Sequence, residues 1–74
     1  MLPEHIVTLE KHKHFYDFFK RTGELVNFFP QVQQDLLAVY RANVDPYYHL
    51  NSSCRDCISE FIINVYEWYS KQPR

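Results

Sequence analysis

A chain of 74 residues is long enough for a single small domain, so residues 1–74 are expected to fold as one unit. A formal net charge of −1 gives no overall field that would attract nucleic acid or an anionic membrane, and a single glycine excludes a glycine-rich phosphate loop. No apolar run reaches the ~18 residues of a membrane span, and no signal-peptide pattern opens the chain, so we expect a cytoplasmic protein without membrane contact.

The first predicted element is a helix over residues 4–21. Its apolar side chains recur at helical spacing on one stripe: Ile6, Leu9, Tyr16 and Phe19. Phe15 and Phe18 widen this stripe and are expected in the core. Pro3 and Glu4 suit the start of such a helix, because proline needs no backbone donor there and an acid suits the positive end of the helix dipole. Gly23 is the kind of residue that follows a helix, so we expect the helix to end just before it.

The second predicted helix covers residues 28–43. The stretch before it is hard to assign, but Asn27 is placed to cap a helix whose first turn contains Pro30. Its apolar stripe has four members: Val32, Leu36, Val39 and Tyr40. The dipeptide Asp45-Pro46 is a turn signal, and it places the end of the helix before it.

The third predicted helix covers residues 53–71 and is the most apolar. Ser53, followed by Asp56 three residues later, is typical of a helix start, and Pro73 indicates a stop. The apolar stripe is long: Cys54, Cys57, Ile58, Phe61, Ile62, Val65, Trp68 and Tyr69. Three helices joined by short loops predict an all-α three-helix bundle with this helix at its centre.

The third helix opens with a C-x-x-C pair, Cys54 and Cys57. The favoured interpretation places both in the core as small apolar residues, so that no cofactor is expected. A zinc site is the first alternative, with His49 as a third ligand. Further candidate ligands are histidines expected on the surface of the first helix: His5, His12 and His14. A redox pair is the second alternative, because a helix N-terminus stabilises a thiolate, although the strand that usually precedes such a pair is missing.

A basic and aromatic segment, residues 11–21, has the cations and rings that suit nucleic acid. Its cations are Lys11, Lys13, Lys20 and Arg21. The near-neutral chain and the interruption by Asp17 count against this use, so nucleic-acid binding is kept as an alternative.

No catalytic motif is present, and the chain is too short to enclose a usual substrate pocket, so we expect neither an enzyme nor a small-molecule substrate.

Aromatic residues are unusually frequent: six Phe, six Tyr and one Trp make up 18% of the chain. These are more rings than one small core is expected to hide, and exposed aromatic clusters often contact other proteins. The residues hardest to place in the core are Phe28, Tyr47, Tyr48, Ile63 and Tyr66. The sequence therefore predicts a protein–protein interaction module that uses these residues, either for self-association or to bind a larger protein.

Residues 35–69 carry two short motifs, an L-x-x-x-Y helix at Leu36–Tyr40 and C-x-x-C followed by Ile58. In both motifs this part of the chain resembles small helical proteins encoded by bacteriophages. The resemblance implies a phage protein that is either a virion component or a factor acting on a host protein. It implies no catalytic residue.

Overall fold

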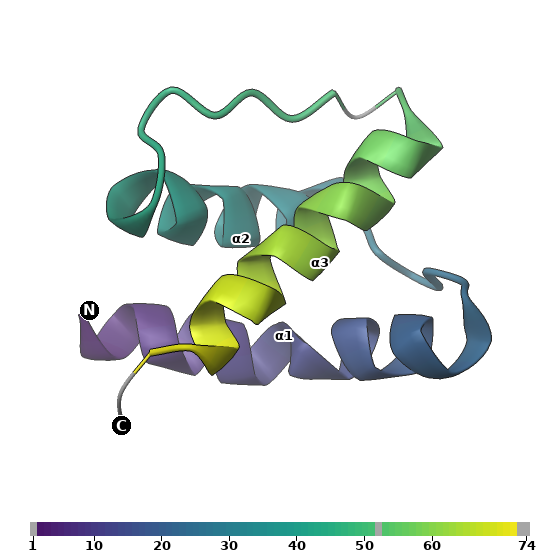
Figure 1. Cartoon of the computed structure of the whole chain (residues 1–74), viewed down its shortest axis with the longest axis horizontal. Coiled ribbons are helices and arrows are strands. Elements are labelled where there is room, and N and C mark those ends of the chain that lie inside the picture. Colours follow the sequence, from purple (N-terminus) through teal and green to yellow (C-terminus); the bar gives the residue numbers. More distant parts are fainter. Residues whose placement is uncertain (1, 52, 73–74) are drawn as a thin grey trace.

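The computed structural model describes residues 2–51 and 53–72, which form three α-helices and no strand (Figure 1). The helices are α1 (Pro3–Thr22), α2 (Pro30–Asn43) and α3 (Arg55–Ser70). The predicted all-α three-helix bundle is confirmed, with each helix within two residues of its expected bounds. Within the described residues, no helix has the length and apolarity needed to cross a membrane.

α1 and α2 run antiparallel, and α3 crosses them diagonally (Figure 1). All three helices contribute to one core, whose buried apolar residues are Leu9, Leu36, Leu37, Val39, Phe61, Ile62, Val65, Tyr66 and Tyr69. Five of these nine lie on α3, so the most apolar helix is also the one that fills the centre. The amphipathic pattern places most of each apolar stripe on this core, although Ile6 of the α1 stripe is 41% exposed.

α1 ends where the sequence indicates. Gly23 adopts the left-handed conformation with φ 80°, and its N–H donates to the carbonyl of Phe19 over 2.7 Å. Glycine accepts this conformation without a steric cost from Cβ, so the helix closes and the chain turns toward α2.

The prediction that Asn27 is the N-cap of α2 is wrong. Asn27 lies in the left-handed region with φ 59° and acts as a turn residue, while Phe29 is the N-cap and Pro30 the first helical residue. Asparagine tolerates this backbone conformation better than most residues, which explains its presence in the turn. The turn separates two adjacent rings: Phe28 packs against Phe15, and Phe29 is 62% exposed.

α3 begins two residues later than expected. Its N-cap is Cys54, whose sulfur accepts the Cys57 N–H, so Ser53 lies outside the helix and does not cap it. The Ser53 N–H instead donates to the side chain of Asn51. Pro73, the predicted stop, lies outside the described residues.

Candidate functional site

One of the residues predicted for the binding surface, Tyr66, is buried. It is 2% exposed, its ring stacks on Tyr16, and its hydroxyl donates to the carbonyl of Leu9 over 2.7 Å. The prediction that Tyr66 lies on the surface is therefore wrong. The carbonyl of Leu9 accepts a hydrogen bond from its hydroxyl, and this bond allows the side chain to be fully buried. Burial first, and the nearby charge of Glu10 second, raise the pKa of Tyr66 above its usual value.

The other predicted contact residues differ in burial. Tyr48 is half-buried between Tyr40 and Phe61, and burial is the main cause that raises its pKa. Phe28 and Ile63 are also half-buried and pack against the core. Tyr47 is 90% exposed. With Tyr66 inside the core, the five residues do not form the predicted patch.

A different apolar surface lies where the end of α1, the connection over residues 23–29 and the start of α2 meet. It is a hollow of about 430 Å³. Its lining residues are His14, Phe15, Phe18, Arg21, Val26, Asn27, Phe29 and Val32. We refer to this hollow as the phenylalanine groove.

The α1 wall of the phenylalanine groove follows a helical stripe. Its members, His14, Phe15, Phe18 and Arg21, recur at spacings of one, three and three residues, which places them along one side of the helix. The sequence contains the same spacing, but the spacing also fits a stripe that packs in the core, which is the position predicted for Phe15 and Phe18. The other lining residues include Phe29, which Pro30 holds in an extended conformation next to the Asn27 turn.

The ionisable side chains that line the groove are bases. Arg21 and His14 lie on its wall, and no lining residue is acidic. The Arg21 guanidinium lies over the Phe18 ring, 5.6 Å from its centre. Within the described ranges 2–51 and 53–72, no carboxylate forms an ion pair with Arg21. The groove therefore combines an apolar floor with a cation that remains available to an anionic group.

The four cations proposed for nucleic acid do not gather on one side of α1. Lys13 and Lys20 are seven residues apart and share a side, whereas Lys11 is two residues from Lys13 and lies on the opposite side. Lys20 lies over the ring of Tyr16, and Arg21 lines the phenylalanine groove. The cations are therefore divided between two surfaces.

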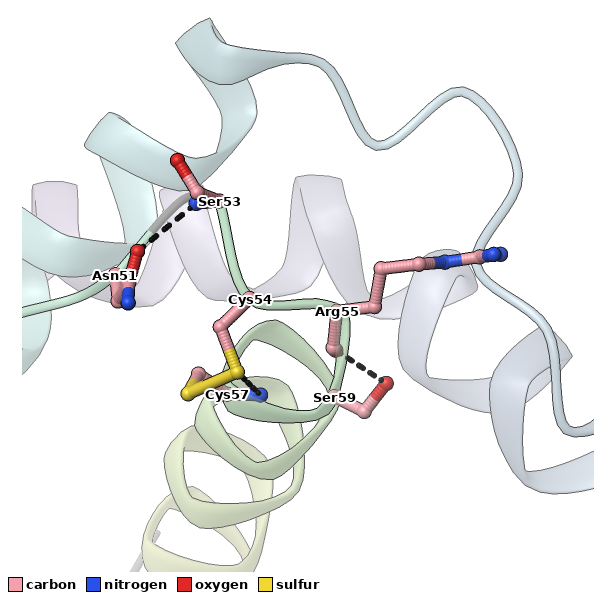
Figure 2. The surroundings of a disulfide bond; sticks show 6 residues. All are labelled: Asn51, Ser53, Cys54, Arg55, Cys57 and Ser59. Carbon is pink, nitrogen blue, oxygen red and sulfur yellow. Dashed lines mark hydrogen bonds between the residues drawn. A yellow bond between two sulfur atoms is a disulfide. The ribbon is translucent and has the colours of Figure 1, made fainter.

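Cys54 and Cys57 form a disulfide bond at the start of α3 (Figure 2). Both cysteines are half-buried and bonded to each other, so the prediction that they lie in the core as small apolar residues is wrong. His49, the proposed third zinc ligand, is exposed. Among the described residues, no three His, Cys, Asp or Glu side chains gather closely enough to hold a metal ion.

His12 was expected on the surface, but it is 6% exposed. Its Nε2 lies 3.3 Å from a carboxylate oxygen of Asp35 on α2. The polar partner on a neighbouring helix makes this burial possible. His14 is exposed, and the half-buried His5 lies 3.1 Å from the amide of Asn43.

No known family model, curated protein or solved structure matches the chain. The chain's own geometry offers two candidate sites: the phenylalanine groove and the Cys54–Cys57 disulfide.

Proposed function

We propose that this protein is a protein–protein interaction module, and that its phenylalanine groove binds an acidic amphipathic helix of a partner protein. The observation that carries the proposal is the 62% exposure of Phe29 beside a hollow lined mainly by apolar side chains. Helix-in-groove recognition uses this combination, since apolar side chains of one helix enter a hydrophobic groove on another protein.

The size of the groove supports a side-chain ligand. Its volume of about 430 Å³ lies near the lower end of the range of roughly 300–1,000 Å³ that binding pockets span. A volume of this order accommodates one or two large apolar side chains. Aromatic side chains at such positions are frequent anchors of binding energy.

The charge of the residues that line the groove indicates which kind of partner helix it would bind. Arg21 and His14 line it and no acid does, so carboxylates beside the partner's apolar residues would be attracted and cations repelled. The resemblance of residues 35–69 to phage proteins would make the partner a virion or host protein. A second copy of this chain is the competing occupant, because small domains gain core by pairing.

The test compares two synthetic amphipathic helices of about 18 residues, or roughly five turns. Both carry the same Leu and Phe stripe, and they differ only in having Glu or Gln at the polar positions. Binding is measured by fluorescence anisotropy, and the surface is located by chemical-shift changes in NMR spectra. We expect the acidic peptide to bind more tightly and to shift the resonances of residues that line the groove.

Phe29→Ala should weaken binding of the acidic peptide about tenfold, the equivalent of about 1.4 kcal/mol. Arg21→Gln should reduce the preference for Glu over Gln. Tyr47→Ala is the matched control, because Tyr47 is a 90% exposed ring outside the groove, and its loss should leave binding unchanged.

Three results would contradict the proposal. The first is that the acidic peptide fails to bind, and the second is that Tyr47→Ala weakens binding as much as Phe29→Ala. The third is a dimer in sedimentation analysis that dissociates in Phe29→Ala, which would make a second copy the occupant. A single-stranded oligonucleotide that displaces the peptide at low salt would support the nucleic-acid alternative instead.

A further inference from the structure

The disulfide is confined to one turn of the chain. Cys54 is the residue directly before α3 and Cys57 is in its first turn, with their Cα atoms 5.2 Å apart (Figure 2). The bond therefore joins two residues of the same element and ties no second helix to α3. The exposed Arg55 lies between them in sequence, and its side chain extends away from the sulfur atoms.

A stabilising role explains this bond poorly. A disulfide constrains the unfolded chain less as the loop that it closes becomes shorter, and this loop is only a few residues long. α3 is already anchored by Phe61, Ile62 and Val65, all of them fully buried. Another role is therefore needed to explain the pair.

The hydrogen bond at Cys54 distinguishes the two sulfur atoms. The Sγ of Cys54 accepts the backbone N–H of Cys57 over 3.2 Å. This N–H is one of the donors that a helix leaves free at its start, and the positive end of the helix dipole lies at the same place. After reduction, a thiolate on Cys54 would keep this donor, and the thiolate is the form that attacks disulfides.

We propose that Cys54 and Cys57 form a thiol–disulfide exchange site, with Cys54 as the nucleophile and Cys57 as the resolving thiol. The substrate class is the disulfide of another protein or of a low-molecular-weight thiol. This inference is independent of the phenylalanine groove, because neither cysteine lines it.

The exchange has two steps. The thiolate of Cys54 attacks one sulfur of the substrate disulfide; that bond breaks, a mixed disulfide forms, and the departing sulfur takes a proton from water. Cys57 then releases its proton to water and attacks Cys54 Sγ, which frees the second substrate thiol and forms the disulfide observed here. Two electrons and two protons pass to the substrate, and a dithiol reductant restores the pair.

The first experiment uses the full chain with dithiothreitol as the dithiol. The substrates are insulin, as a protein disulfide, and oxidised glutathione, as a small one. We expect the chain to increase the reduction rate of at least one substrate several-fold over dithiothreitol alone. The substrate that is accelerated identifies the source of the disulfide, and acceleration of neither would overturn the proposal.

The second experiment separates the roles of the two cysteines. Cys57→Ser should accumulate a stable mixed disulfide with glutathione, visible by mass spectrometry, because no resolving thiol remains. At pH 7, iodoacetamide should alkylate Cys54 in this variant at least several-fold faster than it alkylates Cys57 in Cys54→Ser. Equal alkylation rates would overturn the assignment of Cys54, and a purely structural disulfide would produce no difference. As a control, both variants should remain helical by circular dichroism.

Discussion

The two sides of α1 differ in how deeply the neighbouring aromatic side chains are buried. Toward α3, Tyr66 and Tyr69 are almost fully buried, with 2% and 3% of each residue exposed, although each ring carries a hydroxyl. Toward the start of α2, Phe29 is 62% exposed, although its ring has no polar atom. The usual preference is the reverse, since Phe is buried more often than Tyr.

Hydrogen bonds account for the buried side. The Tyr66 hydroxyl donates to the carbonyl of Leu9, and the Tyr69 hydroxyl donates to a carboxylate oxygen of Glu10, both over 2.7 Å. These bonds tie α3 to α1 at two successive residues and remove the cost of burying the hydroxyls. The tyrosines therefore contribute to folding.

Among the described residues, by contrast, no packing of the Phe29 ring against another aromatic ring explains its position. The fold keeps Phe28 inside by packing it against Phe15 and leaves its neighbour on the surface. A protein can readily leave a single large apolar residue exposed, but here it is joined by Val26, which is 48% exposed, beside a hollow. We therefore attribute the buried tyrosines to folding and, under the proposed function, the exposed Phe29 to binding.

Removing one ring from each side tests this comparison most strongly. Tyr66→Ala should lower the free energy of unfolding by about 3 kcal/mol, because it leaves a cavity in the core. Phe29→Ala should change it by no more than about 0.5 kcal/mol, because its ring is largely in water. Urea unfolding followed by circular dichroism measures both. Similar losses in the two variants would mean that Phe29 is part of the fold.

The hydroxyl of Tyr66 provides a finer test. Tyr66→Phe keeps the ring and loses the bond to Leu9, so we expect the free energy of unfolding to fall by about 1 kcal/mol at pH 7. Burial raises the pKa of Tyr66 above its value in the unfolded chain, which is about 10. The resulting stability is fully present below pH 10 and is lost as the pH rises above it.

Wild-type protein should therefore lose stability between pH 10 and pH 11.5, and Tyr66→Phe should lose less over the same range. Tyr47→Phe is the control, since an exposed hydroxyl should leave this dependence unchanged. If the stability of wild type and of Tyr66→Phe falls equally with rising pH, the buried hydroxyl of Tyr66 is not the cause of the pH dependence.

The helices could be predicted because their evidence is local. The apolar period of each stripe and the position of Gly23 are written within a few turns of sequence. The burial of Tyr66 could not be predicted in this way, because its acceptor on Leu9 is 57 residues away. The same holds for His12, whose partner Asp35 belongs to another helix.

Local chemistry was also ambiguous at the candidate sites. Asparagine is favoured both at a helix N-cap and in a left-handed turn, so the sequence alone did not decide between these roles for Asn27. The C-x-x-C spacing is compatible with core packing, metal binding and a disulfide. The groove was missed because Phe15 and Phe18 were assigned to the core, although their spacing with Arg21 already defined a second stripe on α1.

The smallest expected effect concerns the turn that separates Phe28 from Phe29. Asn27→Ala should lower the free energy of unfolding by about 0.5–1 kcal/mol, because alanine tolerates the observed φ of 59° poorly. Asn27→Gly should leave stability nearly unchanged, since glycine adopts this conformation freely. Binding of the acidic peptide should weaken in Asn27→Ala, because the turn positions the exposed ring of Phe29. If Asn27→Ala unfolds more easily but binds the peptide as well as wild type, the turn serves the fold alone, and the groove does not require this position of Phe29.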